Sequence, residues 1–91
     1  QSKVYKVDPE FYISWTEGAM EFDAMPFPLL IARLSRCYNV DIQIASKELE
    51  TMKFTGVIFR NKPLDFALDI IHRVSDVKFE KKGETILVKK Q

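Results

Sequence analysis

The side chains that could support acid–base, nucleophilic or metal chemistry are few in this chain and widely spaced. Of 91 residues, one is a histidine, His72, and one is a cysteine, Cys37. Histidine-based triads, multi-histidine metal sites and cysteine clusters each need more of these residues than the chain holds. The three glycines are too dispersed for a phosphate-binding loop. We therefore predict no catalytic residues, no cofactor and no metal site, and we expect that the protein is not an enzyme.

One spacing suggests paired carboxylates, that of Asp65 and Asp69, which are four residues apart on one helical face. Catalytic carboxylates need a further polar group to support them, and the sequence places none beside this pair. We expect both to lie on a solvated helix face. Cys37 falls on the apolar side of another predicted helix, so we expect it to be a small buried hydrophobic residue.

The composition is that of an ordinary globular domain, with 46% hydrophobic and 30% charged residues and a net charge of +1. A charge this close to zero gives no electrostatic reason to expect nucleic acid as a partner. The predicted strands also lack the paired aromatic and interleaved basic residues of small RNA-binding sheets. We predict that no nucleic acid is bound, which leaves the recognition of another protein.

The elements that must position any binding site come from an internal repeat, because the chain matches itself without a gap at an offset of 37 residues. The aligned pairs are Phe22 and Phe59, Pro26 and Pro63, Phe27 and Leu64, Ile31 and Leu68, Leu34 and Ile71, Arg36 and Arg73, Val40 and Val77, and Ile42 and Phe79. Each copy reads as a strand, a proline, an amphipathic helix and a second strand, which is a βαβ unit. One such unit cannot bury its own apolar face, so we expect the two copies to share one core.

The apolar periodicity predicts the bounds of these elements. The first copy has a strand at 19–23, a helix at 27–38 closed by Asn39, and a strand at 40–44; the second has a strand at 54–59, a helix at 62–75 and a strand at 77–81, followed by a turn at Gly83 and a last strand at 85–89. The predicted stripe of the second helix comprises Leu64, Ala67, Leu68, Ile71 and Val74. We predict an α+β fold in which two tandem βαβ repeats share one small sheet, with both helices on one face and a terminal β-hairpin.

Residues 1–18 precede the repeat and are interpreted as an approach segment that follows an upstream region, with 19–91 as a single βαβ-βαββ domain. Part of the segment is expected to pair as a short strand. The chain begins at Gln1 and has no run of about 20 apolar residues. We expect it to be a piece of a longer protein whose membrane anchor lies outside this chain.

Two surfaces are candidates for partner binding. Phe66 and Ile70 lie off the apolar stripe of the second helix, with Leu29 and Arg33 at the equivalent positions of the first. Either the helices pack against each other there, or these residues line an exposed groove.

The second candidate is the outer face of the last strand, with Leu87 and Lys89. If that strand is an edge, its unpaired backbone groups could accept a strand from a partner. Trp15, ahead of the repeat, either contacts the partner or caps the core.

Five strings taken in order resemble one known domain. They are W-T-E-G-A-M-E-F at 15–22, P-x-P-L-L-I-A-R-L-S-R-C-Y-N-V-D-I at 26–42, F-T-G-V-I at 54–58, P-L-D-F-A-L-D-I-I at 63–71 and G-E-T-I-L-V at 83–88. From about Val7 to Lys89 the chain resembles the C-terminal domain of FecR-family anti-sigma factors, in the version common in Bacteroidetes. The most specific elements are W-x-x-G, L-S-R-x-Y-N-V and F-T-G.

The resemblance implies a membrane-spanning regulator whose cytoplasmic part binds an extracytoplasmic-function sigma factor and whose C-terminal part lies in the periplasm. This chain would be the periplasmic part. Its partner would be the N-terminal signalling domain of a TonB-dependent outer-membrane transducer, itself a small βαβ-repeat fold of the secretin/TonB short N-terminal-domain type. The sigma factor would be bound by the cytoplasmic part, outside this chain. The resemblance carries no catalytic residues.

Two other functions remain open at this point. The chain could be the signalling domain of the transducer, or of a secretin, since both contain a similar repeat. It could also be a module that self-associates through a sheet edge. The approach segment with Trp15 favours the anti-sigma interpretation.

Overall fold

The computed structural model describes residues 3–8, 11–16 and 18–91, with side chains from residue 18 onward. The elements in chain order are β1 (Lys3–Asp8), β2 (Phe11–Thr16), β3 (Ala19–Pro26), α1 (Phe27–Tyr38), β4 (Asp41–Ile44), the short 3₁₀ helix η1 (Lys47–Thr51), β5 (Lys53–Phe59), α2 (Leu64–Val74), β6 (Val77–Lys82) and β7 (Thr85–Lys90). From β3 onward this is the predicted βαβ-βαββ order, and the α+β class and the terminal hairpin of β6 and β7 are confirmed.

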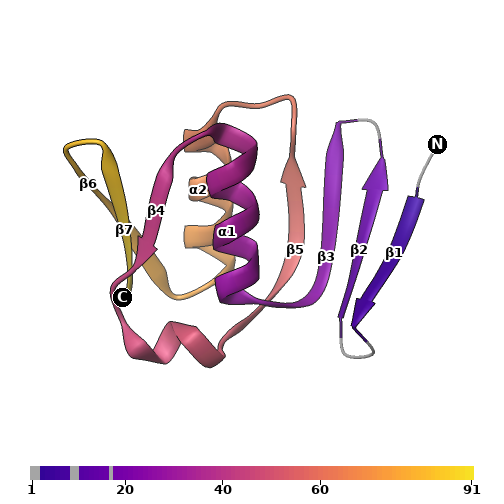
Figure 1. Cartoon of the computed structure of the whole chain (residues 1–91), viewed down its shortest axis with the longest axis horizontal. Helices are drawn as coiled ribbons and strands as arrows, with labels where there is room; N and C mark the ends of the chain where they lie inside the picture. Colours follow the sequence, from indigo (N-terminus) through magenta and orange to yellow (C-terminus); the bar gives the residue numbers. More distant parts are fainter. Residues whose placement is uncertain (1–2, 9–10, 17) are drawn as a thin grey trace.

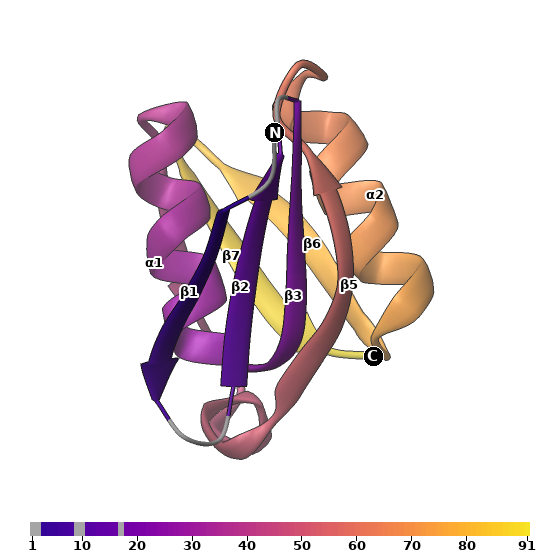
Figure 2. The ribbon, with the colours of Figure 1, turned by 90° about the vertical axis from the view of Figure 1, so that its right-hand side faces the viewer.

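The strands form two sheets, so the prediction of one shared sheet with both helices on one face is wrong. One sheet has the order β1-β2-β3-β5 and the other β4-β7-β6. Figure 1 shows the sheets at opposite ends of the view with α1 and α2 between them, and Figure 2 shows the helices on opposite sides of the molecule.

The reason for the two sheets is that the two strands of one repeat do not pair with each other. β3 pairs with β5, the first strand of the other copy, in antiparallel orientation. β4 pairs with β7 in parallel orientation, and β6 pairs with the other side of β7. Each helix therefore carries the chain from one sheet to the other. Periodicity identifies the buried face of a strand, but it does not say which strand lies beside it.

The core lies between the sheets and takes its side chains from both copies. Among the described residues all buried side chains are apolar: Met20, Phe22, Met25, Phe27, Leu30, Ile31, Leu34, Ile42, Leu49, Phe54, Ile58, Ala67, Leu68, Ile71, Val77, Ile86 and Val88. The aligned helix positions of the repeat supply Ile31 with Leu68 and Leu34 with Ile71, so the duplication does produce a shared core.

The helix boundaries follow the sequence signals. Helix α1 begins directly after Pro26, with proline again in its first turn, where a missing N–H leaves no helical carbonyl unpaired. It ends at Asn39, whose φ of 54° and ψ of 50° are left-handed. The Asn39 N–H donates to the Ser35 carbonyl. Both ends match the predicted bounds, and the left-handed closing residue is confirmed.

Strand β5 is shaped by the F-T-G string. Against Thr55, strand β3 carries a bulge in which Ala24 has a φ of 56° and donates its N–H to the Thr55 Oγ1 at 3.0 Å. The ring of Phe54 lies over Gly56, since a Cβ on that glycine would be 2.7 Å from the Phe54 Cζ. The same ring packs edge-on to Phe22, with centroids 6.2 Å apart. Each residue of the string thus has a structural role.

The segment ahead of the repeat contains two strands, whereas the sequence predicts that part of it pairs as one short strand. β1 and β2 pair antiparallel, and β2 pairs with β3, so both extend the larger sheet. Gly18, with a φ of 91°, stands in the turn between β2 and β3, a conformation that favours glycine. In the described part of the chain, neither helix is long and apolar enough to cross a membrane.

Candidate protein-binding surface

The most exposed aromatic side chains of the described part of the chain lie beside each other at the end of β5 and the start of α2. Phe59 is 40% exposed and Phe66 is 41% exposed. Their ring centroids are 6.1 Å apart at an interplanar angle of 67°, and the Lys62 Nζ lies 5.6 Å from the centroid of Phe66. We call Phe59, Lys62 and Phe66 the aromatic patch. Neighbouring exposed aromatics are typical of surfaces that bind protein.

The patch continues along α2 through Ile70 and Val74, each one turn further on. Ile70, predicted with Phe66, is half-buried and packs on the core, whereas Val74 is 56% exposed. Val74 was expected in the buried stripe, and this is wrong: the core contribution of α2 ends at Ile71, and the next core residue along the chain is Val77 of β6.

Cys37, which the repeat aligns with Val74, is also exposed, so the prediction that it is buried is wrong as well. Here the next buried core residue along the chain after Leu34 is Ile42 of β4. At these two aligned positions, Cys37 and Val74, the side chain is therefore exposed in both copies. A periodic stripe predicts the direction of a side chain, but it does not say where along the helix the core ends.

The helices do not pack against each other at Phe66 and Leu29. Leu29 is 47% exposed, and Figure 2 shows α1 and α2 on opposite sides of the molecule. That alternative is wrong, and Phe66 and Leu29 belong to separate surfaces.

The carboxylates near the patch are engaged in surface ion pairs. Asp69 Oδ2 accepts from the Arg73 Nε at 2.8 Å, and Asp65 Oδ1 lies 3.5 Å from the Lys81 Nζ. The Asp65 and Asp69 side chains are 77% and 54% exposed, which confirms the expected solvated helix face. Among the described residues, no three candidate metal ligands lie close together.

The other predicted surface, around Leu87 and Lys89, lies on the outer face of β7. Strand β7 is the central strand of its sheet, so the idea that it is an edge that accepts a partner strand is wrong. Leu87 is half-buried between Gln43 of β4 and Glu80 of β6. The Lys89 Nζ lies 3.0 Å from a Glu80 carboxylate oxygen, and this contact, followed by Lys78, lowers the pKa of Glu80 below its usual value. The outer face of β7 is therefore mainly charged, with Glu80 between Lys78 and Lys89.

The side chain of Trp15 lies outside the described residues. Its backbone belongs to β2, opposite Met20 of β3. Whether it contacts a partner or caps the core stays a prediction.

Comparison with known proteins decides the family. The family described as FecR, C-terminal, matches residues 19–88, which is the whole repeat. The chain belongs to the FecR family. Two crystal structures of a candidate anti-sigma factor from Parabacteroides distasonis ATCC 8503 are similar to it, with TM-scores of 0.74 and 0.73 at 20% sequence identity. At this identity the likeness shows the fold alone.

The FecR domain described here spans part of those relatives. The match covers 98% of this chain and 51% of the Parabacteroides chain, so it corresponds to about half of that length. A search of curated proteins found no match.

One residue that supports the aromatic patch of this FecR domain was not singled out from its sequence. Tyr38, at the end of α1, donates its O–H to the Lys62 carbonyl at 3.1 Å and lies 3.5 Å from the Phe59 carbonyl. The hydroxyl therefore links α1 to the loop that holds the patch. Burial, followed by the neighbouring Cys37, raises the pKa of Tyr38 above its usual value. The signal in the sequence that could have found Tyr38 is its place in the L-S-R-x-Y-N-V string.

Proposed function

We propose that this chain is the periplasmic signal-receiving domain of a membrane-spanning FecR-like anti-sigma factor, and that it binds the N-terminal signalling domain of a TonB-dependent transducer. The observation that carries the proposal is the FecR C-terminal match over residues 19–88. The exposed aromatic patch supports a binding role, since it offers apolar surface to another protein. The membrane anchor and the part that binds the sigma factor lie outside this chain.

The mechanism we propose is a shift in population. A domain of this size has a free energy of unfolding of about 5 kcal/mol at the lower end of the usual range. A partner that binds the folded form alone and contributes ~2 to 3 kcal/mol changes the populations of the folded and open states substantially. Binding of the transducer would thereby change the position or protease sensitivity of this domain, and the anchor would transmit that change to the sigma-binding part.

The proposal is tested by titrating this chain with the signalling domain of its cognate transducer, followed by calorimetry. We expect saturable one-to-one binding. A complete lack of heat at about 100 micromolar of both proteins, where a contact weaker than roughly 5 kcal/mol escapes detection, would argue against the partner. The sigma-dependent reporter of the full-length regulator should respond to the transducer in parallel, together with the rate of proteolysis of this domain.

Self-association is the competing outcome. Sedimentation of the chain alone at the same concentrations distinguishes it, because a module that assembles with itself forms dimers or larger species without the transducer domain.

A further inference from the structure

On two of the sheet edges in this domain, one backbone group is capped by a side chain. The Ile42 N–H of edge strand β4 donates to the Ser35 Oγ of α1 at 3.3 Å. On edge strand β6, the His72 Nδ1 lies 2.6 Å from the Val77 carbonyl and caps it. Strand β6 also carries three lysines, which discourage the addition of another strand.

Strand β5 is one of the two edges of the larger sheet, the other being β1. Two backbone bonds, one at each end of β5, show which of its residues bond to β3. The Arg60 N–H donates to the Gly18 carbonyl at 2.9 Å, and the Phe27 N–H donates to the Met52 carbonyl at 2.8 Å. In an antiparallel pair, residues alternate between those that bond to the neighbouring strand and those that point away.

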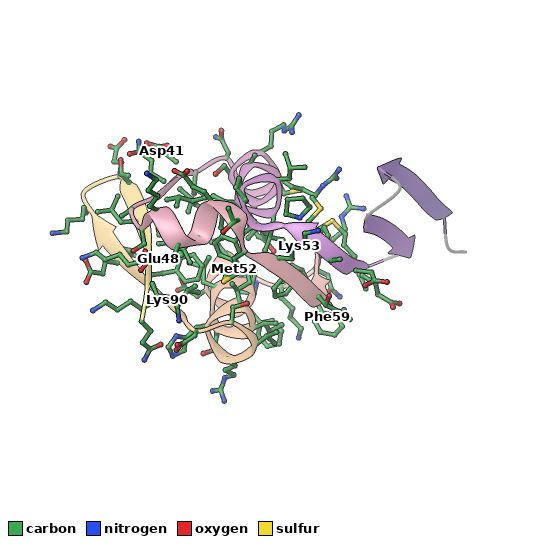
Figure 3. The ribbon with its side chains drawn as sticks, turned by 90° about the horizontal axis from the view of Figure 1, so that it is seen from below. Asp41, Glu48, Met52, Lys53, Phe59 and Lys90 are labelled. Atoms are coloured by element: carbon green, nitrogen blue, oxygen red, sulfur yellow. The ribbon has the colours of Figure 1, made fainter. Side chains whose placement is uncertain are left out.

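Residues 54, 56 and 58 therefore bond to β3, whereas Thr55, Val57 and Phe59 direct their N–H and C=O groups outward. The Phe59 carbonyl meets the Lys62 N–H at 3.4 Å and the Tyr38 hydroxyl at 3.5 Å. Within the described part of the chain, the outward N–H and C=O groups of Thr55 and Val57 and the N–H of Phe59 form no hydrogen bond with another residue. The outward edge thus retains a row of donors and acceptors that ends at the aromatic patch. Lys53 and Phe59 mark the two ends of this strand in Figure 3.

We propose that an extended segment of the partner protein pairs with β5 at Thr55–Phe59 as an added strand and covers the aromatic patch with its apolar side chains. This inference rests on the proposed function and names the surface that performs it. Strand addition supplies backbone hydrogen bonds, and pockets or patches beside the edge select the side chains of the added strand.

The charges of this segment favour a different protein over a second copy of the chain. Residues 53–62 include Lys53, Arg60 and Lys62 and no acidic residue. An antiparallel pair of two β5 strands would bring the Lys53 end of one copy toward the end of the other that is followed by Arg60 and Lys62. Like charges brought together at an interface repel, whereas an acidic strand would meet both ends with opposite charge. The occupant we expect is a strand with apolar and acidic side chains.

Backbone and side-chain variants test the two parts of this contact separately. Val57→Pro removes an outward N–H without a bond to β3, a position where an edge strand tolerates proline. Its control is Val57→Thr, which keeps both the N–H and the β-branch. For the patch, Phe66→Ala is compared with Leu29→Ala, the aligned and similarly exposed position on the opposite side of the molecule.

In calorimetric titrations with the transducer signalling domain, we expect Val57→Pro and Phe66→Ala each to weaken binding by about tenfold or more. Val57→Thr and Leu29→Ala should stay within about twofold of the unchanged chain. Circular dichroism of each variant confirms its fold. Amide hydrogen exchange of the unchanged chain gives a reading that does not depend on the folding of any variant: the Val57 and Phe59 amides should exchange at least about tenfold more slowly in the complex.

The outcomes separate this inference from the proposed function. Binding by the unchanged chain without protection of the Val57 and Phe59 amides overturns the β5 contact and leaves the proposed function standing. A lack of any binding overturns both. Dimers of the chain alone, with these amides protected, overturn the choice of occupant and assign the edge to a second copy.

Discussion

Replacement of Gly56 by alanine gives a direct measure of how tightly β5 is packed. The added Cβ would lie 2.7 Å from the Phe54 Cζ and 3.2 Å from its Cε2, closer than side-chain carbons approach each other without a shift. Phe54 is 1% exposed and its ring packs edge-on to Phe22, so the ring can move only by displacing other core side chains. Overpacking of this kind costs about 1–3 kcal/mol. In a domain of this size, ~2 kcal/mol lowers the Tm by roughly 10 °C.

Urea and thermal unfolding followed by circular dichroism measure this loss. The matched comparison is Phe54→Leu, alone and combined with Gly56→Ala, because the shorter side chain leaves room for the new methyl group. We expect the double variant to lose at least about 0.5 kcal/mol less than the sum of the single changes. Strict additivity, or a loss under about 0.5 kcal/mol for Gly56→Ala alone, would show that the Phe54 ring is not held over the glycine and would refute this reasoning.

Three further predictions concern the end of α1 and the charged face of β7. Asn39→Gly should stabilise the domain by up to about 1 kcal/mol in urea unfolding, because glycine adopts the left-handed conformation without strain, and a loss of stability would contradict this. Tyr38→Phe should cost about 1 kcal/mol at neutral pH through the lost bond to the Lys62 carbonyl. Because the pKa of Tyr38 is raised in the folded state, its contribution to the free energy of unfolding is complete below the usual pKa of tyrosine and is lost as the pH rises through the folded-state pKa. The Tm of the phenylalanine variant should therefore decline less at alkaline pH. Glu80 has a lowered pKa, mainly through Lys89. Its contribution to the free energy of unfolding is present above the usual carboxyl pKa of 4.5 and is lost as the pH falls through the folded-state pKa. Glu80→Gln should therefore flatten the acid side of the stability profile, and an unchanged profile would argue against the ion pair.

The internal repeat made the local elements of this domain predictable. Helix α1 has the bounds expected from its proline entry and from Asn39, and α2 is shorter than predicted, at Leu64–Val74. These features depend on residues close in sequence. The division into two sheets does not, because the antiparallel pairing of β3 with β5 joins segments more than 25 residues apart in the chain.

The same repeat gave one misleading alignment. Phe22 and Phe59 match at the offset of 37, yet Phe22 is 2% exposed in the core and Phe59 is 40% exposed. In the first copy, β3 runs directly into α1 at Phe27, whereas residues 60–63 separate β5 from α2 in the second. Residues 60–63 align with 23–26, which are the last residues of β3, so β5 ends earlier than β3 and Phe59 stands at the end of its strand, exposed beside Phe66. The aromatic patch thus exists because the two copies differ.

The exposure of Phe66 was predictable from its departure from the apolar stripe, which is a local signal. The exposure of Phe59 was not predictable, since it depends on where β5 ends. The prediction for Leu87 and Lys89 supposed that the last strand could be an edge, whereas here β4 and β6 flank it on both sides. Edge position is a property of the whole sheet, and a single strand does not encode it.

The side chains of the F-T-G string and the tyrosine of the L-S-R-x-Y-N-V string act on the structure that presents the surface. Phe54, Thr55 and Gly56 fix the course of β5 and the bulge opposite it, and Tyr38 holds the loop that follows. Substitution of these residues should therefore reduce binding only in proportion to the fraction of unfolded chain. Val57→Pro should reduce binding while the domain stays folded. A difference between these two classes of variant, measured as binding against fraction folded, would separate the residues that build β5 from the groups that its edge offers to a partner.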